Sequence, residues 1–352
     1  DPFIVMGVNA AMLVSIPEGF NATATVTVYV TNSNPSVLTI NGSAASVVPV
    51  VFTAGGAFSQ EVPLAGTAVG NAQLTAGLAG LGSSSLALTV YPKLLGRWIS
   101  GAANLSETSG FRPAGTHDGV AVGTAAALAY SSDLPPGCTG QSLDLRSGNV
   151  GVMVTNSATT DGAYMNTYDD VIRRKFTIAF WAKGFPGTWN PWVSKRGDDN
   201  IGWQLRRMGG DPVAGFTLRG LDNSDGTGSS INVNDTSWHH YAGVWDAATG
   251  ARTLYVDGVL SHVVNNAVGQ MMNLAATKHL AFGARADGGT GFDSYFAGLL
   301  FDVRLYSYPL SESEVLGLMP ATVKLTGRSA ILVGGTTPLT VSIPAGANAS
   351  VS

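Results

Sequence analysis

Hydrophobic and polar positions alternate in short runs along the first 92 residues. Between residues 24 and 31, Val26, Val28 and Val30 fall on one face and threonines on the other. A period of two built from Val and Thr predicts a half-buried β-strand. Turn residues such as those at 32–36 separate this run from its neighbours. Further short apolar runs lie at 37–40, 47–53, 60–64 and 86–90. This spacing predicts a β-sandwich over residues 1–92.

The string of short strands in residues 1–92 resembles the bacterial immunoglobulin-like repeats of secreted and surface proteins. Residues 92–96, from Pro92 to Gly96, are then expected to form a linker. Beyond it the composition changes, because six of the seven tryptophans fall between residues 181 and 245. Short strands are again predicted, at 176–181, 202–205, 215–219, 241–245, 253–256 and 301–306.

Two local sequence motifs in this second region predict a hairpin turn and a short helix. Asp257-Gly258 tolerates the positive φ that a two-residue hairpin tip requires. Ser311 and Glu314 have the spacing of a capping box, which predicts a short helix over 311–316. No convincing amphipathic helix separates the strands, so the predicted fold class is all-β.

The ordered motifs of residues 95–319 resemble the laminin-G-like jelly roll, a concanavalin-A-like sandwich common in large bacterial secreted proteins. The motifs are Trp238-His-His-Tyr241, Leu254-Tyr-Val-Asp-Gly258 and Gly298-Leu-Leu-Phe-Asp-Val-Arg-Leu-Tyr306. The resemblance implies an immunoglobulin-like sandwich at 1–92 followed by a concanavalin-A-like jelly-roll sandwich at 93–319.

Residues 320–352 repeat the start of the chain. Val341-Ser-Ile-Pro344 with Gly346 and Asn348-Ala matches Val14-Ser-Ile-Pro17 with Gly19 and Asn21-Ala, at an offset of 327 residues. This echo predicts the first strands of a following immunoglobulin-like repeat, and hence an array of copies. The strands could continue into the same polypeptide or be donated to a neighbouring copy.

Composition removes several function classes. The chain has 19 Lys and Arg and a net charge of −4, which argues against a nucleic-acid partner. No apolar run is long enough for a membrane span. The single cysteine, Cys138, excludes an intrachain disulfide framework. The chain starts with Asp1-Pro2, which suggests a processed or excerpted polypeptide.

Catalysis is not expected. Glycosidases use paired carboxylates, and the laminarinase-like members of the resembled family use two glutamates on one strand. No glutamate lies between residues 108 and 311, and no strand presents two aspartates at alternate positions. Nucleophile-elbow, zincin and phosphate-loop motifs are also missing from the sequence.

Calcium is the expected cofactor. The resemblance implies a structural calcium at Asp302 on the final strand, and Asp118 is a lower-ranked ligand. Hard cations prefer such carboxylate and carbonyl oxygens. The alternative is that Asp302 hydrogen-bonds a turn or pairs with Arg304 or another cation.

Glycans are the expected small ligands. Exposed aromatic rings stack on the apolar faces of sugars. Trp189 and Trp192 lie in a predicted loop, and Arg206 could line the same surface. The alternative is that both tryptophans pack into the sandwich edge and that the arginine lies on a solvated face.

We therefore expect a non-catalytic structural and adhesive repeat unit of an extracellular surface or filament protein. Its expected partners are other copies of itself, arranged head to tail. The alternative is a calcium-dependent, lectin-like carbohydrate-binding module, including one accessory to a polysaccharide-degrading enzyme.

Overall fold

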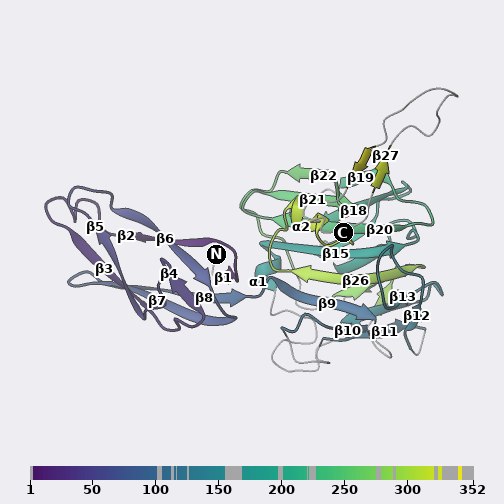
Figure 1. Cartoon of the computed structure of the whole chain (residues 1–352), viewed down its shortest axis with the longest axis horizontal. Helices are drawn as coiled ribbons and strands as arrows, with labels where there is room; N and C mark the ends of the chain where they lie inside the picture. The colour runs from purple at the N-terminus through teal and green to yellow at the C-terminus, as the bar shows by residue number, and fades with distance from the viewer. Residues whose placement is uncertain are drawn as a thin grey trace. The chain divides into compact units, whose positions relative to one another are not determined.

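The computed structural model describes most of the chain, and it is nearly all β. The described residues are 3–100, 105–111, 115, 117–124, 127–154, 169–196, 201–219, 221, 227–274, 279–287, 291–320, 324–326 and 340–342. The chain divides into two compact units, Asp1–Leu95 and Gly96–Ser352 (Figure 1). The all-β fold class predicted from the sequence is confirmed.

The first unit is built from two sheets. One has the order β1-β8-β7-β3-β5 and the other the order β2-β6-β4. The strands are β1 (Phe3–Val5), β2 (Ala10–Ser15), β3 (Val26–Asn32), β4 (Leu38–Ile40), β5 (Val47–Phe52), β6 (Ser59–Gly66), β7 (Gly70–Leu78) and β8 (Gly82–Tyr91). β1 runs parallel to β8, and every other pairing in these sheets is antiparallel.

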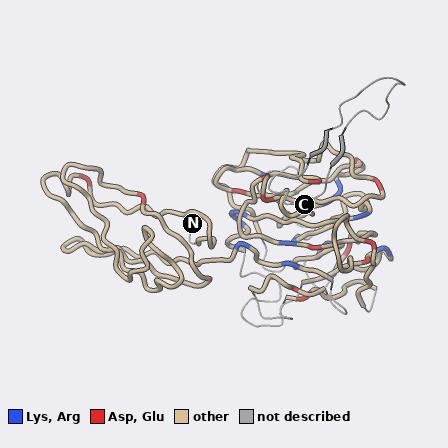
Figure 2. The backbone as a smooth tube through the Cα atoms, viewed as in Figure 1, with Lys and Arg blue, Asp and Glu red and all other residues tan. Residues whose placement is uncertain are grey.

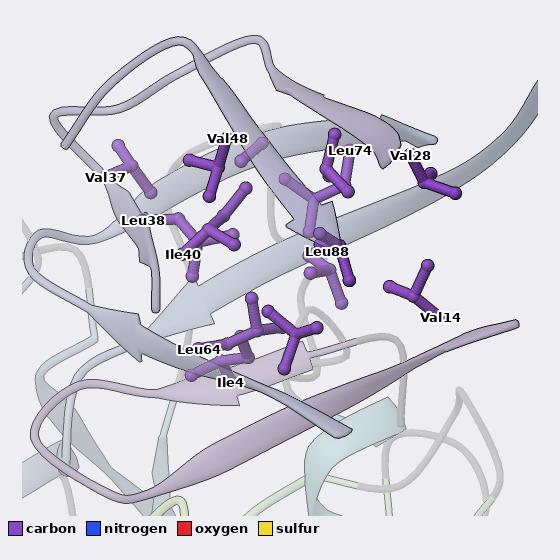
Figure 3. Packing of buried hydrophobic residues seen from close by; sticks show 14 of the residues in the cluster. Ile4, Val14, Val28, Val37, Leu38, Ile40, Val48, Leu64, Leu74 and Leu88 are labelled. Atoms are coloured by element: carbon purple, nitrogen blue, oxygen red, sulfur yellow. The ribbon is translucent and has the colours of Figure 1, made fainter. Parts of the chain in front are cut away.

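Alternating aliphatic residues from both sheets form the core of this unit. Val28 and Val30 of β3 are buried, as the alternation predicted, whereas Tyr29 between them is exposed. Figure 3 shows Val28 with Leu38, Leu64 and other members of this buried cluster between the strands. The immunoglobulin-like character of the unit stays a prediction.

The second unit contains a path of strands that folds back on itself. Its order is β19-β18-β17-β16-β23-β14-β11-β10-β9-β26-β15-β20-β21-β22. In addition, β13 pairs with β26, and β12 pairs with β13. The strands before β15 are β9 (Leu94–Ser100), β10 (Leu105–Glu107), β11 (Gly119–Gly123), β12 (Ala129–Ser131), β13 (Ser142–Asp144) and β14 (Val150–Val154). β9 begins at Leu94, so the expected linker shrinks to Pro92 and Lys93.

Among the remaining described elements, six strands overlap the predicted runs and most of these extend beyond them, whereas the other strands and the first helix had no predicted run. These elements are α1 (Asp169–Ile172), β15 (Lys175–Lys183), β16 (Pro191–Arg196), β17 (Gly202–Arg207), β18 (Val213–Leu218), β19 (Thr227–Asn232), β20 (Trp238–Asp246), β21 (Ala251–Val256), β22 (Val259–Asn265), β23 (Ala281–Phe282), β24 (Arg285–Asp287), β25 (Gly291–Asp293), β26 (Leu299–Tyr306) and α2 (Glu312–Leu316). Asp257 and Gly258 have φ of 51° and 74° at the β21–β22 tip, which confirms the predicted hairpin.

Aromatic contacts show which strands face each other across the sandwich. Phe176 of β15 lies 5.1 Å, centroid to centroid, from Trp203 of β17 and 5.8 Å from Phe216 of β18. A Cβ at Gly243 of β20 would lie 2.8 Å from the same Phe216 ring. Strands far apart in the sheet order are therefore packed face to face, with aromatic rings between them.

The segment after β26 packs against β15. The Thr177 hydroxyl donates to the Tyr308 carbonyl and accepts from the Leu310 N–H, both at 2.9 Å. α2 then begins with Ser311 as its N-cap, and the capping box with Glu314 is present as predicted. Past residue 320, the described residues are β27 (Lys324–Thr326) and β28 (Thr340–Ser342), which pair antiparallel. The rest of the predicted repeat at 320–352 lies outside the described residues.

Candidate functional site

Trp189 occupies a tight turn that presents its ring to solvent. The turn is closed by a hydrogen bond of 3.0 Å from the Asn190 N–H to the Gly187 carbonyl. Trp189 itself has a φ of 66° and is 44% exposed. A bulky residue rarely adopts this left-handed conformation, and such strain often accompanies functional positions. The local backbone thus holds a large apolar ring at the surface.

The ring rests on a support built from the next hairpin. The Arg206 guanidinium carbon lies 4.5 Å from the Trp189 ring centroid, a cation–π contact. A Cβ at Gly209 would lie 3.0 Å from Trp189 Cζ2, so the ring packs closely over this glycine. Arg206 is 4% exposed, and therefore the guanidinium under the ring is shielded from water. The sequence predicted Trp189 and Arg206 as neighbours on one surface, and the structure brings them together.

A second arginine fixes the two loops to each other. Arg207 donates to the carbonyl oxygens of Asp211 at 3.1 Å and Gly210 at 2.6 Å, and its guanidinium also stacks on Phe185 at 4.9 Å. Its backbone N–H donates to the Asn190 carbonyl at 3.1 Å. The Trp189 turn and the β17–β18 hairpin are thus joined through one residue. This role of Arg207 could not be predicted from a local pattern, because its hydrogen-bond partners are backbone atoms of other residues.

Trp192 has a different environment, and here the prediction of a ligand-facing ring is wrong. The side chain is fully buried and stacks on Tyr241 at 4.7 Å between centroids. A register shift between Pro191 and Val193 marks a bulge in the β16–β17 pairing at this residue. Trp192 therefore belongs to the core between the sheets, which was the alternative reading for both tryptophans.

Asp302 lies between two arginines. Its carboxylate accepts from Arg97 at 2.6 and 2.9 Å and from Arg304 through both oxygens. Burial alone would raise the pKa of the Asp302 carboxyl, but the two guanidinium groups outweigh it and hold that pKa below its ordinary value. Asp302 also has a φ of 51°, at a register shift between β26 and β15. The pairing with Arg304 was the alternative to calcium.

Asp118 lies in a different hydrogen-bond network. Its carboxylate accepts from the Glu107 N–H at 2.8 Å, and the Glu107 carboxylate accepts from the Arg97 N–H at 3.1 Å. Within the described residues, no group of three or more His, Cys, Asp or Glu side chains could hold a metal. Two cations already bind both oxygens of Asp302, so its surroundings do not fit a calcium ion. Calcium binding by this protein stays a prediction.

The adjacent histidines point to opposite faces of β20, as expected for neighbours on a strand. His239 lies between two aspartates, with its Nδ1 2.8 Å from Asp257 and its Nε2 3.1 Å from Asp235. The hydrogen bond with Asp257 raises the pKa of His239. His240 is buried and packs edge-on against Trp181 at 5.2 Å, and burial followed by the charge of Arg304 lowers its pKa to about 4.

Comparison with known proteins identifies the class of the second unit. Residues 157–316 match the Laminin_G_3 family, described as the concanavalin A-like lectin/glucanases superfamily. The chain therefore contains a domain of this superfamily. No curated protein matches the chain. In the described residues, no helix has the length and apolar character to cross a membrane.

Several solved structures are similar at low sequence identity. Domain 4 of AbnA, an extracellular arabinanase from Geobacillus stearothermophilus in complex with arabinotriose, has 19% identity and a TM-score of 0.48, and the match covers 65% of this chain and 98% of that one. The binding domain of botulinum neurotoxin serotype D/C has 17% identity and a TM-score of 0.44, over 64% of this chain and 51% of that one. A SAP-like pentraxin from Limulus polyphemus has 17% identity and a TM-score of 0.33, over 41% and 68%.

Proposed function

We propose that the second unit is a non-catalytic carbohydrate-binding module that acts in adhesion outside the cell. The observation that carries this proposal is the presentation of Trp189. We infer that the exposed part of this indole, which rests on Arg206 and packs against Gly209, stacks on the apolar face of a sugar ring. Because the ring is fixed before any ligand arrives, binding costs little conformational entropy.

The surroundings of Trp189 supply the polar part of such a site. Gly187 and Thr188 precede it in the turn and are exposed, as are Gly210 and Asp211 on the facing hairpin. Backbone groups, a hydroxyl and a carboxylate next to an aromatic ring suit a ligand with many hydroxyls. We propose that sugar binding at this site does not depend on calcium.

The absence of catalysis is part of the proposal. Glycoside hydrolysis needs two carboxyl groups about 5–9.5 Å apart, one of them in most cases with a raised pKa. The second unit has three glutamates, Glu107, Glu312 and Glu314, and none lies between residues 108 and 311, so within that stretch aspartates would have to provide both groups. Asp133, Asp144, Asp235, Asp293 and Asp302 all have pKa values lowered by hydrogen-bonding partners, which is unfavourable for a general acid.

The test is binding of the whole chain to immobilised β-glucans and galactans. Replacing Trp189 by Ala should weaken binding roughly 30-fold, since truncating an aromatic anchor costs on the order of 2 kcal/mol. Val120→Ala changes another exposed apolar residue and should leave binding unchanged. Chelator should have no effect, and the purified protein should leave the glycans uncleaved. Equal binding by wild type and Trp189→Ala, or no binding by the wild type, would overturn the proposal.

A second role is favoured by the echo between residues 14–23 and 341–350. We propose that the chain is also a structural repeat unit that joins other copies head to tail. Heterologous contacts whose rotation does not close a ring build open arrays. The measurement is sedimentation of the whole chain over a wide concentration range, where a constant monomer mass would overturn this role.

A further inference from the structure

Asn190 holds the turn that carries Trp189 through three hydrogen bonds. Its backbone N–H donates to the Gly187 carbonyl at 3.0 Å, and its backbone carbonyl accepts from the Arg207 N–H at 3.1 Å. Its side-chain amide adds a third bond, from Nδ2 to the Tyr295 carbonyl at 3.1 Å. The first bond closes the turn, and the other two connect it to β17 and to the chain segment that follows β25.

The Tyr295 carbonyl is a well-anchored acceptor. Next to it in the chain, Phe296 is fully buried, and its ring packs edge-on against Trp192 with 6.4 Å between centroids. The Phe296 N–H also donates to the Gly283 carbonyl at 2.9 Å. The bond from the Asn190 amide therefore ties the turn to a segment that is fixed in the core of the second unit.

Gly187 makes room for the Asn190 amide. A Cβ at Gly187 would lie 3.0 Å from Asn190 Nδ2 and 3.5 Å from its Cγ. The shorter of these distances is below the optimum for two non-bonded heavy atoms, so a methyl group at this position would press on the amide. A side chain at position 187 would therefore act on the bond to Tyr295 without changing Asn190 itself.

Trp189 lies between these fixed points in an unfavourable backbone conformation. Its φ of 66° is left-handed, and a bulky residue keeps such a backbone only where its surroundings over-determine it. In this conformation the ring contacts the buried Arg206 guanidinium at 4.5 Å and packs against Gly209. Without the side-chain bond of Asn190, one constraint on this φ is lost, and the turn relaxes toward negative φ. The ring then leaves its support.

We propose that Asn190 is a positioning residue for glycan binding: its side-chain amide keeps Trp189 in the left-handed conformation before any ligand arrives. Asn190 acts through the ring and makes no contact with the sugar. The apparent affinity of a site is its intrinsic affinity multiplied by the fraction of molecules in the binding-competent conformation. Loss of the amide bond lowers that fraction and therefore weakens binding. This inference rests on the proposed function for its ligand, whereas the conformation of the ring can be measured without one.

Three single variants separate the effect of this bond from an effect on the fold. Asn190→Leu keeps the branched shape of the side chain and removes the donor. Gly187→Ala presses on the amide and leaves Asn190 in place. Asn34→Leu is the matched control, because it removes an amide-to-carbonyl bond of 3.2 Å to Asn71 in the first unit. Circular dichroism and urea unfolding of the whole chain confirm that each variant is folded.

The first measurement needs no ligand. In ¹H–¹⁵N NMR spectra of the whole chain, each tryptophan gives one indole N–H signal, and the signal that Trp189→Ala lacks belongs to Trp189. In Asn190→Leu and Gly187→Ala this signal should move toward its position in the urea-unfolded chain, while Asn34→Leu should leave it unchanged. A Trp189 signal at the wild-type position in folded Asn190→Leu would overturn the proposal. If Asn190→Leu fails to fold, Gly187→Ala decides by the same criterion.

The second measurement is binding to the β-glucans and galactans that test the proposed function. Asn190→Leu should weaken binding roughly 5-fold, the value of one ordinary hydrogen bond. In the Trp189→Ala background the same substitution should have no further effect, because Asn190 acts through the ring. An equal loss in both backgrounds would mean that Asn190 contacts the sugar itself, and the positioning role would be wrong. A wild type that binds none of these glycans would overturn the proposed function and the glycan part of this inference, and the indole signal would still decide whether Asn190 fixes the ring.

Discussion

The two units reach stable all-β folds with very different chemistry. The first unit carries only four charged residues, Asp1, Glu18, Glu61 and Lys93, and no tryptophan, and its core is aliphatic. Figure 2 shows few charged positions along the first unit and many acidic and basic positions along the second. The second unit holds all seven tryptophans and places arginines against aspartates across its strands.

This difference indicates which unit should respond to changes in pH and salt. A sandwich with so few charged residues is held mainly by apolar burial, which changes little with pH or salt. The surface of the first unit therefore presents few charged groups to a partner, which would have to recognise its shape or its strand edges. The second unit adds buried ion pairs and histidines, whose contribution depends on protonation. We expect changes in solution conditions to act on the second unit first, and tryptophan fluorescence reports on that unit alone.

The largest expected effect comes from breaking the Asp302 cluster. Asp302→Ala leaves Arg97 and Arg304 facing each other without the carboxylate, and Arg304 is mostly buried. Losing one partner of a buried pair costs about 3–5 kcal/mol, and the lower part of that range is expected because Arg97 is partly exposed. Urea unfolding followed by tryptophan fluorescence measures the loss.

Asp144→Ala is the control for this experiment. Asp144 pairs with Arg146, which is exposed, so its removal should cost much less than the removal of Asp302. The loss at Asp302 should be the same in calcium and in chelator. A calcium-dependent rise of the melting temperature that disappears in Asp302→Ala would show that the site holds the ion after all.

Local signals explain why much of the fold could be predicted from the sequence. The Val28–Val30 alternation, the Asp257-Gly258 tip and the Ser311–Glu314 box each depend on residues within a few positions of one another. Such features form in the same way whatever the rest of the chain does. The pairing of Asp302 with Arg304 is also local, since the two are separated by a single residue.

The site depended on information that no local pattern contains. Trp189 and Trp192 look alike in the sequence, yet a positive φ exposes the first, and the second lies in the core at a strand bulge. The buried Trp192 stacks on Tyr241, which lies 49 positions away along the chain. Likewise Arg97 meets Asp302 across 205 positions, a contact that follows only from the order of strands in the sheet.

His240 should make the second unit sensitive to acid. The pKa of His240 is about 4 in the folded chain and about 6.5 when unfolded, so acidification protonates the unfolded state first. The free energy of unfolding then falls as the pH drops below about 6.5, by about 2 kcal/mol at pH 5. Fluorescence-detected urea melts between pH 7 and pH 5 measure this slope.

His240→Leu should flatten that slope while keeping the unit folded, because the site is buried and apolar on the Trp181 side. The first unit has no histidine, so its own transition should not shift over this range. An unchanged slope in His240→Leu would place the acid sensitivity elsewhere.

The smallest expected effect belongs to His239, and its sign is opposite. The pKa of His239 is raised chiefly by its hydrogen bond to Asp257, so the folded state binds a proton more tightly than the unfolded state. Its contribution is complete below about pH 6.5 and is lost as the pH rises through the raised value. Both aspartates are largely exposed, which limits the gain to less than about 1 kcal/mol. His239→Gln should therefore destabilise the unit at pH 5.5 more than at pH 8.5, and added salt should shrink the difference. If His239→Gln costs more at pH 8.5 than at pH 5.5, the ion pairs do not stabilise this end of β20.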